Sequence, residues 1–234
     1  MNAQLSVWWA HLLATDAPAL PTALAMQIWL HLGWSVVLAS VGAGVVSRYW
    51  PAKAGRLELR HWGTALVLAL WTWVPGEYSP AYWLGLVFQA PSIVAVLLCD
   101  VFLRKRFFAN RSGPAAVYAP NRFRLSLAVA GVLLGWALML DTLALLPLQL
   151  YSWGFSPVAL ALALLVSLLP WLSGASPRHS RWWVLPLALL VFVVWRLPSG
   201  NVWDAVLDPC LWLALHGYLA RAAWRHYTTR RARG

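Results

Sequence analysis

The sequence is poor in charged residues, and above all in acidic ones. Asp and Glu together number 7 in 234 residues, all charged residues make up 11%, and hydrophobic residues make up 61%. A single soluble core of this chain length cannot bury that much apolar surface. The composition therefore excludes an ordinary soluble protein and predicts an integral membrane protein.

Cysteine is also scarce, and the familiar catalytic motifs are absent. Cys99 and Cys210 fall in apolar segments near opposite faces of the predicted bilayer, which favours neither a disulfide nor a thiolate metal site. The sequence contains no Gly-x-Ser-x-Gly, His-Glu-x-x-His, phosphate-binding loop or dinucleotide fingerprint. An enzyme is therefore the less favoured interpretation, and no cofactor is expected.

No Lys or Arg precedes Arg48, so the start of the sequence lacks the basic region of a cleavable secretory signal. We therefore expect this first segment to be retained. Its apolar stretch, residues 5–13, is too short to cross a bilayer. Residues 1–21 are predicted to form an interfacial segment on the periplasmic surface.

Seven apolar runs are candidates for membrane-crossing helices, each of which needs about 20 residues to cover roughly 30 Å of hydrocarbon. They cover residues 22–47, 62–74, 81–103, 125–147, 157–173, 182–197 and 202–224. The second and sixth are short and need a locally thinned bilayer or shelter from neighbouring helices. We expect an all-α integral membrane domain of seven transmembrane helices over residues 22–224.

The basic residues predict the orientation of these helices. Of the 18 Lys and Arg, all but Arg196 fall in alternate connections or at the C-terminal end. Because such residues stay in the cytoplasm, the N-terminus is expected outside a bacterial-type inner membrane, with residues 225–234 as a basic cytoplasmic tail. Contact with lipid headgroups accounts for the net charge of +11, so no nucleic-acid partner is expected.

The first three and last three predicted helices have a similar layout. In each triplet a long helix is followed by a short one and then by one that contains a proline, Pro91 or Pro209. Parallel repeats of this kind occur in transporters, with the substrate site between the halves. A 3+1+3 parallel repeat is therefore one hypothesis; the other is that Trp and Pro cluster at membrane boundaries without any duplication.

Polar residues within the hydrocarbon are costly, roughly 2.5–3.5 kcal/mol for a charged residue at a helix centre, and usually face the bundle interior. Two stripes with a spacing of four residues, 27–31–35 and 204–208–212–216, are expected to meet near the outer leaflet. Together with polar residues of similar depth they predict a periplasm-facing pocket for a substrate or protons. Its candidate residues are Gln27, His31, Glu77, Gln89, Asp141, Asp208 and His216.

Each feature of this pocket also has a structural interpretation. Asp141 and Asp208 are placed to cap helix ends, and Gly131 and Gly135 suit close helix packing. Asp100 stands four residues before Arg104, which favours a structural ion pair.

Three functions follow from this pattern. The first is a transporter or channel for a small solute or ion. The second is an accessory, assembly or structural subunit that contacts other membrane subunits through its polar stripes. The third is a redox protein with haem or copper at His31 and His216, assisted by Met26 or Met139. The lipid bilayer is a partner in all three.

Overall fold

The computed structural model of the chain describes residues 20–50, 57–107, 122–172 and 183–231. This part of the chain is helical and contains no β-strand. Its elements are α2 (Ala23–Tyr49), α3 (Leu57–Trp71), η1 (Gly76–Tyr78), α4 (Pro80–Phe88), α5 (Ile93–Phe107), α6 (Arg122–Thr142), α7 (Leu150–Trp153), α8 (Pro157–Leu172), α9 (Val184–Trp195), α10 (Val202–Val206) and α11 (Pro209–Arg231). The predicted interfacial segment lies almost wholly outside the described residues, and its placement stays a prediction.

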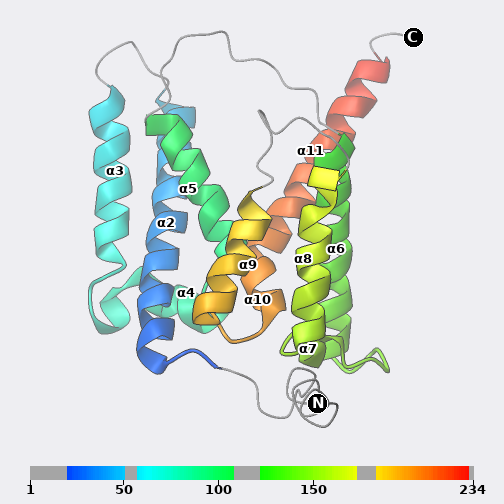
Figure 1. The fold of residues 1–234 in the computed structure, drawn as a ribbon. Coiled ribbons are helices and arrows are strands. Elements are labelled where there is room, and N and C mark those ends of the chain that lie inside the picture. Colours follow the sequence, from blue (N-terminus) through cyan, green and yellow to red (C-terminus); the bar gives the residue numbers. More distant parts are fainter. Residues whose placement is uncertain (1–19, 51–56, 108–121, 173–182, 232–234) are drawn as a thin grey trace.

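The long helices run along roughly one axis, and successive ones run in opposite directions (Figure 1). The C-terminal ends of α2, α5 and α11 lie at one end of the bundle, the upper end in Figure 1, and the C-terminal end of α9 lies at the other. The last turns of α2 and α5 contain Arg48 and residues 104–106, which are all basic. Arg196 follows α9 at the opposite end. The basic ends of the described helices therefore lie together.

Two of the described helices have the length and apolar composition of a membrane span, Ala23–Tyr49 and Leu125–Thr142. The other predicted spans are shorter helices, such as α3 with 15 residues and α9 with 12, or two helices in series. Helix α6 ends earlier than predicted because Ala144 has a φ of 55°. The N–H groups of Leu145 and Ala144 donate to the carbonyls of Leu140 and Asp141, which closes the helix as a Schellman motif.

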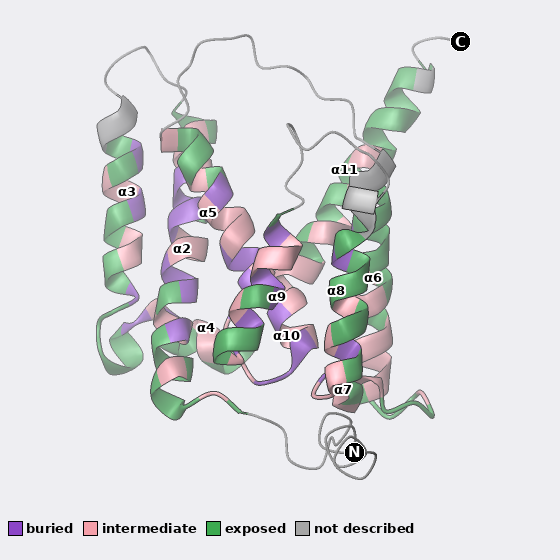
Figure 2. Cartoon of the chain, in the orientation of Figure 1, coloured by how far each residue is buried: buried purple, intermediate pink, exposed green. Residues whose placement is uncertain are grey.

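Many large apolar side chains lie on the surface of the described bundle. Large apolar side chains such as Leu133, Leu165 and Val194 are about 60% exposed. Most of the buried residues lie on α2, α5, α9 and α10, and the outward faces of α3, α6 and α8 are mostly exposed (Figure 2). Buried polar or charged side chains include Ser35, Ser40, His61, Thr72, Ser79, Ser92, Ser167, Asn201 and Asp208. An apolar exterior around a partly polar interior suits a lipid environment or contact with other apolar proteins.

The apolar core lies between helices from the first half of the chain and helices from the second half. It contains Trp29 of α2, Ile93 of α5, Phe192 of α9 and Val202 of α10, which pack in one cluster. Helix α9 contacts α5, α8 and α10 and is the central element of this cluster. The core therefore joins the first helices of the chain to the last ones and positions the polar groups described below.

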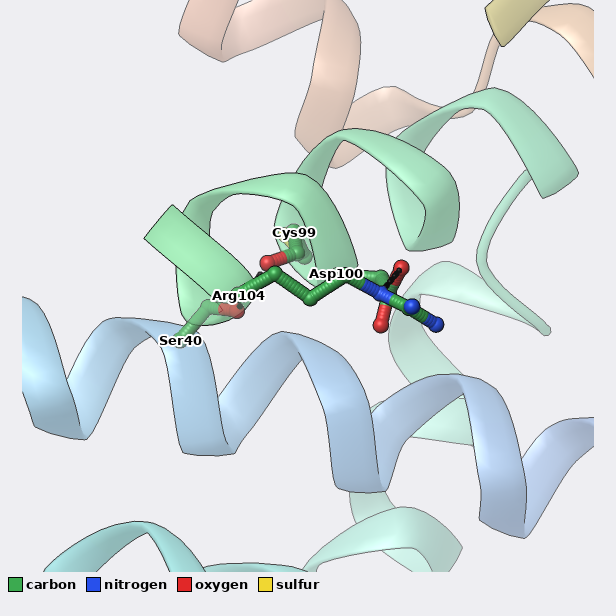
Figure 3. Close-up of polar contacts among 4 residues, drawn as sticks. All are labelled: Ser40, Cys99, Asp100 and Arg104. Carbon is green, nitrogen blue, oxygen red and sulfur yellow. Dashed lines mark hydrogen bonds and ion pairs between the residues drawn. The ribbon is translucent and has the colours of Figure 1, made fainter. Parts of the chain in front are cut away.

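The packing of α2 against α5 also includes polar contacts (Figure 3). Ser40 Oγ donates to the carbonyl of Cys99 at 3.1 Å. Within α5 itself, Arg104 Nε donates to Asp100 Oδ2 at 2.6 Å, which confirms the predicted i,i+4 ion pair. Because the Arg104 side chain is 73% exposed, this pair adds little stability in water.

The two predicted triplets share an order of elements but differ in packing. A helix, a turn, a short helix, a break and a longer helix follow one another both from α3 to α5 and from α9 to α11. In the first triplet α2 packs against α3, α4 and α5, whereas α8 packs mainly against α9, and α11 packs mainly against α6. The likeness is therefore local, and a duplication of the whole triplet stays a prediction.

Candidate binding cavity between two broken helices

The third predicted span is broken between α4 and α5. Pro91 has no N–H and disfavours helical backbone in the residue before it. Gln89 has φ 62° and ψ −156°, a conformation that only glycine adopts without strain. Helix α4 therefore ends at Phe88, and α5 begins after Ser92, whose Oγ accepts a hydrogen bond from Ala95 N at 3.1 Å.

Two tryptophans of α2 satisfy carbonyl groups at this break. Trp34 Nε1 donates to Gln89 O at 3.0 Å, and Trp29 Nε1 donates to Pro91 O at 2.9 Å. Both indoles are buried, where an unpaired polar group costs about 1–3 kcal/mol. The sequence places these two tryptophans in the middle of an apolar run, which indicates that each indole N–H needs a buried partner. It does not indicate which carbonyl groups are the partners.

The seventh predicted span is broken in the same way, between α10 and α11. Asp208 separates the two helices and Pro209 is the first residue of α11. Asp208 Oδ1 accepts from Leu211 N at 2.8 Å, which is the helix-capping contact predicted as an alternative for this residue. Its Oδ2 accepts from Ser92 N at 2.8 Å and from Ser92 Oγ at 2.5 Å.

The Asp208 carboxylate thus joins the N-terminal ends of α5 and α11. Only 7% of Asp208 is exposed, so its charge needs compensation in place of water. Three hydrogen bonds and the positive ends of two helix dipoles provide it. The side chain is a structural link between residues 116 positions apart.

A cavity of about 230 Å³ adjoins the two breaks. Gln89 and Asp208, two of the residues predicted for the pocket, line it, and so does Asp204, a member of the predicted stripe on the seventh span. The rest of its wall is mainly apolar. The full set is Met26, Phe88, Gln89, Ala90, Pro198, Ser199, Asp204, Leu207, Asp208 and Pro209.

Asp204 lies on α10 and has two hydroxyl partners. Tyr151 OH donates to Asp204 Oδ2 at 2.8 Å, and Ser199 Oγ donates to the same oxygen at 2.5 Å. Burial, and then the Asp204 charge, raise the pKa of Tyr151. The phenol therefore stays protonated and acts as a donor. No hydrogen bond to Asp204 Oδ1 is formed by the part of the chain that the structure describes.

Asn201 fixes α10, which carries Asp204, to α7. Its Oδ1 accepts from Trp203 N at 2.9 Å and caps α10, and its Nδ2 donates to Tyr151 O at 2.9 Å. A Cβ atom on Gly154 would lie 1.8 Å from Asn201 Oδ1, so this contact requires glycine. Tyr151, Ser199 and Asn201 were missed by sequence reasoning; the one available signal was Asn201 directly before an apolar helix.

His31 belongs to a separate site at the end of α3. Its Nδ1 lies 2.5 Å from the carbonyl of Thr72, which also accepts from Ser79 Oγ at 2.7 Å. Ser35 Oγ contacts Thr72 Oγ1 and donates to His31 O at 2.7 Å. These contacts tie the C-terminal end of α3 to α2.

Gln27 and Glu77 also lie away from the cavity lining. Both are exposed. Glu77 is part of η1, and its carbonyl accepts from Trp83 Nε1 at 2.8 Å. Their predicted binding role is supported by no contact with the cavity and stays a prediction.

Asp141 and His216 lie in two further contacts. Asp141 Oδ2 accepts from Tyr151 N at 2.7 Å and so satisfies the first turn of α7. His216 Nδ1 lies 2.9 Å from Trp212 O, and its Nε2 accepts from Trp136 Nε1 at 3.2 Å. In the same α6–α11 interface, Trp212 packs on Gly135, where a Cβ atom would lie 2.3 Å from the indole.

The histidines are therefore engaged in different interfaces, His31 against α3 and His216 against α6. Among the described residues no group of three His, Cys, Asp or Glu is placed to hold a metal ion. The arrangement instead offers a small cavity with carboxylate, hydroxyl and amide groups on an otherwise apolar wall. Neither a protein-family model, nor a curated protein, nor a solved structure matches this chain.

Proposed function

We propose that the chain is a multi-pass protein of a bacterial-type inner membrane, with seven crossings, its N-terminus outside and its C-terminus in the cytoplasm. The apolar exterior of the bundle and the shared position of its basic helix ends support this arrangement. Exposed tryptophans occur near both ends of the described helices, Trp71, Trp83 and Trp195 at one and Trp62 and Trp224 at the other. Such aromatic belts are typical of membrane interfaces.

The short helices are compatible with this proposal. Helix α3, with 15 residues, extends over roughly 22 Å, and α9, with 12 residues, over roughly 18 Å at 1.5 Å per residue. Both fall below the roughly 30 Å of a typical hydrocarbon layer. Local thinning of the bilayer and the adjoining turns would cover the difference.

We further propose that the protein transports a small solute or ion through the cavity between the broken helices. The observation that supports transport most directly is that two discontinuous helices meet at one carboxylate, Asp208, beside a cavity of about 230 Å³. In transporters such helices bring half-helix ends and unpaired polar groups to the substrate. A break in a helix within the membrane is tolerated where it is buried or lines a cavity.

A steric block of the cavity tests this function. Ala90 lines the cavity, so Ala90→Trp should fill it, whereas Ala130→Trp places the same side chain on the exposed face of α6. Uptake of radiolabelled small cations, alcohols and amino acids into proteoliposomes is the measurement. Transport is supported if at least one solute is taken up and Ala90→Trp alone abolishes that uptake. Uptake that is absent, or equal in both variants, rejects it.

A subunit of a larger membrane complex is the second candidate. It is favoured by the observation that Asp141, Asp208 and His216 all bind groups of this chain, as structural polar residues do. Purification in mild detergent separates the candidates. A partner that is retained at constant stoichiometry, together with no solute uptake, would favour the subunit.

A further inference from the structure

Two acidic residues line the cavity, and no basic residue among the described ones does. Asp204 and Asp208 are the ionisable residues of its wall, and none of the described residues that line it is Lys, Arg or His. Arg196, a nearby cation in the sequence, is placed elsewhere, with its guanidinium 5.4 Å from the ring centre of Phe192. The cavity therefore favours a cation over an anion.

The two carboxylates are not equivalent. Asp208 uses both oxygens to join α5 and α11. Asp204 uses Oδ2 for Tyr151 and Ser199, and its Oδ1 has no hydrogen-bond partner within the described chain. Its position in the first turn of α10 compensates only part of the charge. Asp204 Oδ1 is thus the acceptor that remains for a ligand.

The remaining wall suits an apolar body beside that charge. Phe88 provides an aromatic ring, Met26 a polarisable thioether and Leu207 an aliphatic surface. The volume of about 230 Å³ has room for roughly seven groups of the size of water. Hard metal ions prefer about six oxygen ligands, and two carboxylates of which one is fully engaged are a poor match for them.

We propose that this cavity binds a small organic ammonium cation. The charged nitrogen lies against Asp204 Oδ1, and its alkyl groups pack against Phe88 and Met26. This inference rests on the proposed transport function and adds its substrate class.

Choline and its neutral carbon analogue, 3,3-dimethyl-1-butanol, are a matched pair of probes because they differ in charge and hardly in shape. Binding to the purified full-length protein in detergent is measured by calorimetry. We expect choline to bind at least about tenfold more tightly than the alcohol, because only the quaternary nitrogen of choline carries a charge that the Asp204 carboxylate attracts. Acetate is the anionic control and should not bind.

Asp204→Asn should weaken choline binding by about tenfold or more, because it removes the negative charge that attracts the quaternary nitrogen, and should leave the alcohol unaffected. It keeps an oxygen for Tyr151 and Ser199, and thermal unfolding checks that it remains folded. Asp100→Asn is the matched control, because it removes a carboxylate outside the cavity lining; its choline affinity should equal that of the unmodified protein. The comparison of choline with the alcohol holds even if Asp204→Asn does not fold.

The proposal is overturned if choline does not bind, if the alcohol binds as tightly, or if a folded Asp204→Asn protein retains full affinity. Uptake into proteoliposomes separates this result from the proposed function. Choline binding that depends on Asp204 but is not followed by uptake would retain the cation site and reject transport. Uptake of neutral solutes alone would retain transport and reject the cation site.

Discussion

Asp208 links two helix ends that are far apart in the sequence. Ser92 and Leu211 donate three hydrogen bonds to its carboxylate, which is almost fully buried. Removing such a buried acceptor leaves its donors without partners, which costs more stability than replacing it with a side chain that still accepts hydrogen bonds. The stability of the junction should therefore depend on this one side chain.

Replacing Asp208 with alanine should lower the free energy of unfolding by about 3 kcal/mol, because two helix caps are lost together. Asn keeps an acceptor oxygen and should lose about half as much. Unfolding in SDS-containing mixed micelles, followed by tryptophan fluorescence, is the measurement. Asp100→Ala is the control and should change the free energy by less than about 1 kcal/mol. An equal loss in both alanine variants would contradict the role of Asp208.

Gly154, directly after α7, packs closely against Asn201, the N-cap of α10, and so also joins distant segments of the chain. Gly154→Ala should destabilise the protein by about 2 kcal/mol, because the new methyl group collides with the Asn201 amide. Gly63→Ala is the matched change, since a Cβ atom on this α3 residue meets nothing within 4 Å; it should be neutral or stabilise by about 0.5–1 kcal/mol. Thermal unfolding in detergent compares the two. The contact is refuted if Gly154→Ala is as stable as Gly63→Ala.

At the scale of elements, the break between α4 and α5 depends on a neighbouring helix. The backbone groups that Pro91 and Gln89 leave outside a helix are satisfied by indoles of α2. This explains how a broken helix can persist inside an apolar bundle. It also makes α2 necessary for the shape of the cavity that Gln89 lines.

Trp29→Phe and Trp34→Phe each keep an aromatic ring and remove only the indole donor. Each should lower the free energy of unfolding by about 1–2 kcal/mol, because a buried carbonyl loses its partner. Trp195→Phe, at a residue that is 57% exposed, should cost less than about 0.5 kcal/mol. Equal costs at all three positions, measured by SDS unfolding, would show that the indole bonds do not support the break.

The sequence was sufficient for the elements that depend on local pattern. Apolar runs predicted the positions of the longer helices, Pro91 and Pro209 marked the two breaks, and spacing predicted the Asp100–Arg104 pair. It was insufficient for contacts between distant segments. Tyr151 and Asp204 are 53 positions apart, and no periodicity within either segment relates them. The early end of α6 was missed because a left-handed Ala144 has no sequence signal as clear as glycine.

The whole molecule is proposed to cross the bilayer in one defined direction. The basic helix ends must face the cytoplasm, and the cavity must open to the opposite side. The outward apolar faces then contact lipid, and the polar groups lie inside. Transport of a solute from outside the cell, and access of a cation to the cavity from that side, both depend on this orientation.

Labelling of single cysteines in intact cells tests it most directly. After Cys99 and Cys210 are replaced by alanine, Gln89→Cys is placed at the cavity and Lys105→Cys at a basic helix end. A membrane-impermeant maleimide should label Gln89→Cys in intact cells and Lys105→Cys only after the cells are opened. Labelling of Lys105→Cys from outside, with Gln89→Cys protected until the cells are opened, would contradict the proposed orientation.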